Sequence, residues 1–181
     1  MTNSSGNDIV SSRKDRWTAE WFNAVISSYP EESARFFRDT RDPFANPVGA
    51  ALKKGITDLF EVIRADTFDR DAAHAALEPM IRVRAIQEFT PSEALGFITA
   101  IKTIMENDSE AAARSGAGAE KLQRMAENAD KALLTAFDIY MECKKQVYGL
   151  RARQARDSVR QLLIKKELIS ELPDIDPELT Q

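Results

Sequence analysis

The most constraining feature of the sequence is a long helical pattern near its carboxyl end. Between about residues 120 and 169 the chain has no proline, and Gly149 is the one weak point in the pattern. No run of alternating apolar and polar residues is long enough to predict a β-strand. The sequence therefore predicts an all-α fold, a helical bundle with a long C-terminal helix.

The two halves of this predicted helix differ in character. The first half has apolar residues on most of its faces, which is typical of a helix buried in a bundle. The second half, residues 144–166, contains eight basic residues and one acid. Its net charge is +7 in a chain whose total is −4, which leaves −11 for the remainder. The basic residues considered as an interaction surface are Lys144, Lys145, Arg151, Arg153, Arg156 and Arg160.

A basic amphipathic helix invites a partner, and three interpretations are open. The helix could associate with a second copy or fold back on the acidic body, dock to an anionic protein, or bind nucleic acid or a membrane surface. Aromatic residues do not interleave with the basic ones, so we expect no nucleic-acid partner. Self-association is favoured, and we expect a homodimer together with a regulatory or signalling protein partner.

Composition divides the chain into four parts. Residues 1–14 are polar and small and are expected to be disordered, and residues 15–152 are expected to form a helical domain. Residues 153–169 are expected to continue the C-terminal helix, and residues 170–181 to form an acidic tail. We expect a cytoplasmic protein, because the N terminus lacks an apolar signal segment and no segment approaches the roughly 18 apolar residues of a membrane span.

Few residue types are available for catalysis or metal binding. Cys143 is the only cysteine and His74 the only histidine, so neither a multi-cysteine metal site nor a histidine-based catalytic triad can be assembled. A haem-binding, globin-like sensor would have to use His74, which lies beside an apolar sector rather than within it. We therefore expect no cofactor, no metal site and no enzymatic activity.

Residues 79–105 carry the most specific local signals. Pro79 is expected to end one helix and to begin the next. The segment Thr90-Pro91-Ser92-Glu93 predicts a capping box with proline at the first helical position, so another helix should begin at Pro91. The sequence thus predicts two helices joined by a tight turn.

Arg82 occupies an unusual position in the first of these two helices. A helical projection places it in the middle of an apolar sector, where a guanidinium group needs a carboxylate or a bound anion opposite it. Asp138 and Glu142 are the candidate carboxylates, and without them a small anionic ligand centred on Arg82 is the alternative. Arg84, on the other side, is expected to pair with Glu88 in solvent. The apolar sector consists of Ile81, Ala85, Ile86 and Phe89.

Three segments, residues 46–49 (NPVG), 81–102 (IRVRAIQEFTPSEALGFITAIK) and 136–151 (AFDIYMECKKQVYGLR), together resemble the RsbRD-type N-terminal sensory domain. This domain is found in co-antagonists of the bacterial stress-response kinase RsbT, and the likeness covers about residues 15–152. The resemblance implies an input domain and, by analogy with the RsbR-type input domain, a haem-free, globin-like helical dimer. The polar positions that match the family motif are Arg82, Arg84, Gln87, Ser92 and Lys102.

Proteins of that type continue through a linking helix into a STAS output domain, which does not follow the helix in this sequence. We therefore expect output through a separate protein or through oligomerisation of the basic helix. The sequence as a whole predicts a non-enzymatic sensory or adaptor domain of bacterial signalling that acts through protein contacts. The alternative is a binding module for a small anion centred on Arg82.

Overall fold

The computed structural model describes residues 4–87, 89–109 and 117–166. The chain divides into two units, residues 1–143 and residues 144–181, and each is described by itself. Regular structure in the described ranges is helical throughout and includes no strand. The predicted all-α bundle with a long C-terminal helix is confirmed.

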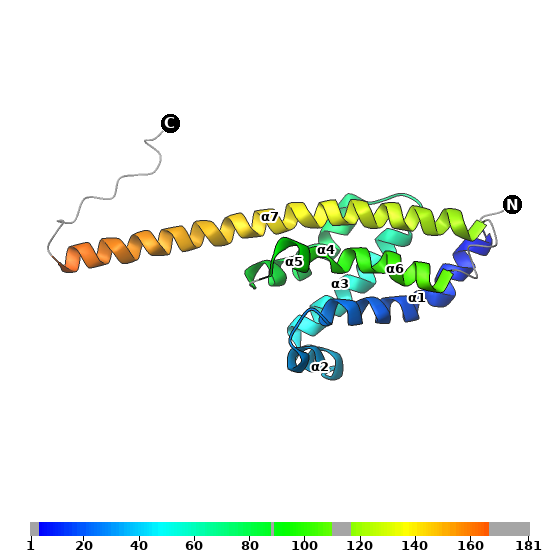
Figure 1. Ribbon diagram of the computed structural model, residues 1–181, viewed down its shortest axis with the longest axis horizontal. Coiled ribbons are helices and arrows are strands. Elements are labelled where there is room, and N and C mark those ends of the chain that lie inside the picture. The colour runs from blue at the N-terminus through cyan, green and yellow to red at the C-terminus, as the bar shows by residue number, and fades with distance from the viewer. Residues whose placement is uncertain (1–3, 88, 110–116, 167–181) are drawn as a thin grey trace, which may run out of the picture. The chain divides into compact units, whose positions relative to one another are not determined.

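The first unit is built from helices of unequal length (Figure 1). Helix α1 packs against α6 and α3, α3 packs against α4, and α2 lies against α1 and α3. The helices are α1 (Ser4–Ile26), α2 (Glu31–Asp39), α3 (Pro47–Arg64), α4 (Arg70–Ile86), α5 (Pro91–Leu95), α6 (Phe97–Ser109) and α7 (Ala117–Lys165), of which α7 continues into the second unit.

The tryptophans of α1 anchor the core of the first unit. Trp17 and Trp21 are fully buried, and their indole N–H groups donate to Asp108 Oδ2 and to the carbonyl of Phe97, both at 2.7 Å. Phe60 of α3 meets Trp17 edge to face, with 6.4 Å between the ring centroids. Helices α1, α3 and α6 therefore share one core.

Helix α1 begins earlier than the sequence indicates. The sequence predicts disorder through residue 14, whereas the structure describes helix from Ser4 onwards. Val10 is buried and Arg13 bonds to Asp108 of α6, so this part of α1 has tertiary partners that composition does not reveal.

Helix α4 runs across Pro79, where the sequence predicts a break. A proline inside a helix costs roughly 3 kcal/mol. Its neighbours Leu77, Met80 and Ile81 are fully buried, and each fully buried side chain of this kind contributes about 1.5–3 kcal/mol. Packing on both sides of the proline thus outweighs the lost backbone hydrogen bond.

The predicted capping box at Thr90 is confirmed. The Thr90 N–H donates to Glu93 Oε2 at 2.9 Å, and Thr90 Oγ1 accepts from the Glu93 N–H at 3.4 Å. Hydrogen bonds from the Thr90 hydroxyl and backbone hold the pKa of the Glu93 carboxyl below its usual value. The helix that begins at Pro91 is short, because α5 ends at Leu95 and α6 begins only after Gly96.

Helix α7 contacts the rest of the first unit through one of its faces. The Asn128 amide donates to the carbonyls of Ile63 and Ala65 at the end of α3, both at 3.0 Å. The Tyr140 hydroxyl donates to the carbonyl of Phe89 at 3.0 Å. The described part of the second unit, residues 144–166, is helical to Lys165 and consists of exposed and half-buried residues.

Candidate functional site

Arg82 is not the buried arginine that the sequence predicts. Its side chain is 55% exposed and pairs with Glu78 on the same helix, where Arg82 Nη2 donates to Glu78 Oε1 at 2.6 Å. Two carboxylates were expected opposite it. Asp138 instead accepts from Arg70 Nη2 at 3.0 Å, and Glu142 is exposed on α7. The prediction that Arg82 is buried in an apolar sector is therefore wrong, and its carboxylate partner is Glu78 of the same helix.

Arg84 takes the buried position instead, and it is 0% exposed. Because α4 continues across Pro79, the helical phase set by Ala73 and Leu77 brings Arg84 to the core rather than Arg82. A helical projection that continues through Pro79 places Arg84 on the same face as Ala73 and Leu77. The buried stripe of α4 is Ala73, Ala76, Leu77, Met80, Ile81, Arg84 and Ala85.

The guanidinium group of Arg84 bonds to main-chain and hydroxyl oxygens. Nε donates to the carbonyl of Ala94 at 2.9 Å, and Nη2 donates to the carbonyl of Glu93 at 2.8 Å and to Ser28 Oγ at 2.9 Å. No ion pair to Arg84 occurs within the described ranges, and its predicted partner Glu88 lies outside them. Arg84 therefore ties α4 to the loop after α1 and to α5.

Three aromatic rings surround the same guanidinium group. The Arg84 Cζ lies 5.1 Å from the ring centroid of Tyr29, 4.4 Å from that of Phe89 and 5.5 Å from that of Phe97. A cation over ring faces away from water is stabilised by about 2 kcal/mol or more. Burial lowers the pKa of Arg84 and raises the pKa of Tyr29, a rise that the Arg84 charge partly offsets. The arrangement is that of a structural clamp.

The other residues of the predicted ligand site have separate partners. Ser92 Oγ lies 3.2 Å from Thr90 Oγ1 at the start of α5, and Gln87 is half-buried directly after α4. Lys102 Nζ donates to both carboxylate oxygens of Asp130, at 2.7 and 2.9 Å. The described contacts therefore do not bring the five predicted positions to one site.

Other sequence candidates are placed as follows. His74 is exposed on α4. Among the described residues, no group of three His, Cys, Asp or Glu side chains could hold a metal ion. A helix long and apolar enough to span a membrane is not found in the described ranges.

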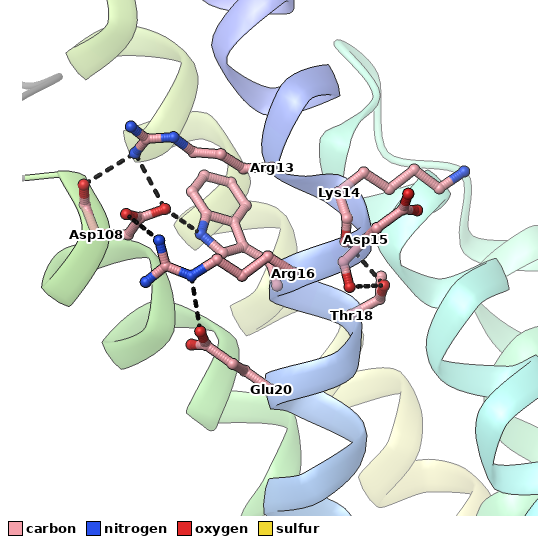
Figure 2. A network of polar contacts seen from close by, with 8 residues as sticks. Arg13, Lys14, Asp15, Arg16, Thr18, Glu20 and Asp108 are labelled. Carbon is pink, nitrogen blue, oxygen red and sulfur yellow. Dashed lines mark hydrogen bonds and ion pairs between the residues drawn. The ribbon is translucent and has the colours of Figure 1, made fainter.

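A polar cluster around Asp108, which the sequence did not reveal, joins α1 to α6 (Figure 2). Asp108 Oδ2 accepts from Trp17 Nε1 at 2.7 Å and pairs with Arg13 Nη1 at 3.0 Å, and Oδ1 accepts from Arg16 Nη1 at 3.0 Å. Arg16 also donates to Glu20 at 2.9 Å. More than ninety residues separate Asp108 from these partners, so no local pattern could predict the cluster.

Helix α7 exposes apolar side chains on the face opposite its buried stripe. In the first unit, Leu134 is 68% exposed, and Phe137 and Met141 are also exposed. In the second unit, Tyr148 and Leu162 are each 61% exposed. The sequence predicts that the first half of this helix is buried within the bundle. In the described residues, one face of it is buried and the opposite face is exposed. The buried residues of α7 include Met125, Ala129, Ala132, Ala136, Ile139, Tyr140 and Cys143.

Comparison with known proteins identifies one family. Residues 15–155 match the RsbT co-antagonist protein rsbRD N-terminal domain. No curated protein and no solved structure gives a significant match. Since the matched region covers most of the chain, the protein belongs to the family of rsbRD N-terminal domains, which are signalling and sensory domains of the stress-response pathway.

Proposed function

We propose that the protein is a non-enzymatic, cytoplasmic regulatory domain that works as a homodimer joined through the exposed apolar face of α7. Its signal would pass to a separate regulatory protein. The observation that carries the proposal is the row of large apolar side chains that α7 leaves in solvent, because surface patches of this kind mark contact sites.

The spacing of these residues supports pairing with another helix. Five apolar residues of α7 follow one another at intervals of seven, which supplies one of the two apolar positions that each heptad has in paired helices. Phe137 and Val159 lie beside the row and are also exposed. The five residues are Leu134, Met141, Tyr148, Ala155 and Leu162.

A second copy of the chain is the simplest partner for this face, because it offers the same row. Fully burying a large apolar side chain contributes roughly 1.5–3 kcal/mol, and each residue of a symmetric interface contributes twice. The basic residues of the second unit oppose pairing by like-charge repulsion. At physiological ionic strength, salt screens the interaction between exposed charges that lie more than about 8 Å apart, which weakens this repulsion.

Substitution of Leu162 tests the proposal. Leu162→Glu removes an apolar contact from both copies and should raise the dimer dissociation constant by about a hundredfold or more, measured by native mass spectrometry over a concentration series. The matched control is Gln146→Glu, which adds the same charge to an exposed position on the opposite side of the helix. Circular dichroism checks that both variants stay helical. Equal dissociation constants for the two variants would contradict the proposal.

A further inference from the structure

A groove of about 880 Å³ lies on the first unit. Residues of α1, of α2, of α3 and of the segment between α2 and α3 line it. Lys14, Asp15 and Thr18 belong to this lining, and Figure 2 shows them on the side of α1 away from Asp108. The groove is therefore separate from the Asp108 cluster, and we call it the α1–α3 groove.

Helices α1 and α3 line the groove with residues of the same spacing. On each helix, pairs of adjacent residues recur every four positions, so the pairs follow one another along one side of the helix. Each set extends about 14 Å along its helix axis. A third helix of about two to three turns matches this length, and its side chains can pack between those of α1 and α3. The pairs are residues 14–15, 18–19 and 22–23 of α1 and residues 49–50, 53–54 and 57–58 of α3.

The lining contains apolar surface that an occupant can cover. Phe22 and Phe37 are half-buried and Ile56 is buried, so contact with apolar side chains would remove the remaining exposed area of the two rings from water. Ala19 and Ala50 also line the groove, and small side chains at a contact let two helices approach closely. The lining therefore suits the apolar face of a helix.

Three cations of the lining have no carboxylate partner among the residues that the structure describes. They are Arg38 of α2, Arg41 of the segment after α2, and Lys53 of α3, whereas the other two cations of the lining each form an ion pair. Arg38 Nε donates to the neutral side chain of Asn23 at 3.4 Å. Five basic and two acidic residues give the lining a net charge of +3. The groove thus suits an occupant that brings carboxylates as well as apolar side chains.

We propose that the α1–α3 groove binds an acidic amphipathic helix of a separate regulatory protein. The apolar face of that helix lies on Phe22 and Phe37, and the carboxylates beside this face pair with the three cations that have no carboxylate partner. An amphipathic helix that lays its apolar face into a groove is a recurring mode of protein recognition. A nucleic-acid backbone fits the lining less well, because Asp15 and Asp58 would face its phosphates.

This inference rests on the part of the proposed function that passes the signal to a separate protein, and it adds the chemistry of that partner. It does not depend on the dimer, because the groove and the exposed apolar row of α7 consist of different residues. The domain would contact its partner through the first unit and a second copy through α7.

A synthetic helical peptide tests the inference on the full-length protein. The probe is a fluorescein-labelled, hydrocarbon-stapled peptide of about twelve residues, with leucines along one face and glutamates beside them. It should bind with a dissociation constant in the micromolar range, measured by fluorescence anisotropy. Binding should shift the amide nuclear magnetic resonance signals of Phe22, Phe37 and Ala50. A peptide with lysine for glutamate, and one with alanine for leucine, should each bind about tenfold more weakly or worse.

Reversing the charge of the groove should exchange its preference between the peptides. Arg41→Glu with Lys53→Glu should weaken binding of the glutamate peptide about tenfold or more and strengthen binding of the lysine peptide, because attraction becomes repulsion. The matched control is Arg153→Glu with Arg156→Glu, which changes the net charge equally at exposed residues that do not line the groove. It should leave both affinities within about twofold of the wild type, since salt screens distant charges. Circular dichroism checks that both variants stay helical.

The inference is overturned if the glutamate peptide shifts none of the groove signals, or if reversing Arg41 and Lys53 leaves its affinity unchanged. Equal binding of the leucine and alanine peptides would also overturn it, because the groove would then recognise negative charge alone. Leu162→Glu separates this result from the dimer, since it should leave the peptide affinity unchanged. A wild-type protein that is monomeric yet binds the peptide in the groove would contradict the dimer and support the present inference.

Discussion

At the scale of single residues, the two neighbouring arginines of α4 should respond very differently to substitution. Arg84→Ala should lower the free energy of unfolding by about 3–5 kcal/mol, because the buried carbonyls of Glu93 and Ala94 would lose their donor and three rings their cation. Arg84→Lys should also destabilise, since an ammonium group cannot reproduce the planar fork. Urea unfolding followed by circular dichroism measures both effects.

Arg82→Ala is the matched control for this prediction. Arg82 is exposed and, among the described residues, pairs with Glu78 of α4, so its removal should leave the urea midpoint close to that of the wild type. A loss of stability for Arg82→Ala as large as that for Arg84→Ala would contradict the assignment of the clamp.

Tyr29 should make the stability of the protein fall in alkaline solution. Burial raises the pKa of its hydroxyl in the folded state above the value of about 10 that it has when unfolded. Below that pH the hydroxyl is protonated in both states and has no effect on the pH dependence. Above it the unfolded chain loses the proton first, so stability decreases as the pH rises toward the folded pKa.

Tyr29→Phe should therefore flatten the decline in unfolding free energy above about pH 10, measured by urea titration at a series of pH values. Tyr148→Phe, at an exposed position of α7, is the control. Identical alkaline slopes for wild type and Tyr29→Phe would show that the Tyr29 hydroxyl does not influence stability in this range.

At the scale of helices, Asp108 should hold the end of α6 to α1. Asp108→Ala removes hydrogen bonds to Trp17 and to two arginines and should cost roughly 1.5–3 kcal/mol, because bonds to charged groups lie in that range. Trp17 fluorescence reports directly on the change. Asp130→Ala, which removes an exposed partner of Lys102, should cost less than about 1 kcal/mol. If the two variants unfold alike, the cluster does not join α1 to α6 in the way described.

Helix boundaries show what could be predicted from the sequence. The fold class, the long terminal helix and the Thr90 capping box depend on local patterns, and they were predicted correctly. The predicted break at Pro79 was wrong, because burial of Leu77 and Met80 depends on contacts with other helices. Because of that error, the predicted buried face of the helix was shifted, and Arg82 was expected to be buried where the structure buries Arg84.

The candidate site could be predicted less well than the fold. Its residues were chosen as polar members of a motif, yet Lys102 pairs with Asp130 and Ser92 lies beside Thr90. The Lys102–Asp130 pair depends on a tertiary contact that residue type does not encode, whereas Ser92 and Thr90 meet locally at the start of α5. The basic character of residues 144–166, in contrast, follows directly from composition.

At the scale of the whole molecule, membership of the rsbRD N-terminal domain family and the exposed face of α7 lead to the same account. A regulatory domain can act by changing the contacts of other proteins, and α7 offers apolar surface for such contacts. We propose that a second copy covers this surface in the working molecule.

The most direct test is the mass of the unmodified full-length protein in solution. One chain has a mass of 20.3 kDa. Sedimentation equilibrium over micromolar concentrations at physiological salt should give about twice that mass, with dissociation only on dilution. A mass of one chain at every concentration would contradict the central claim that α7 joins two copies.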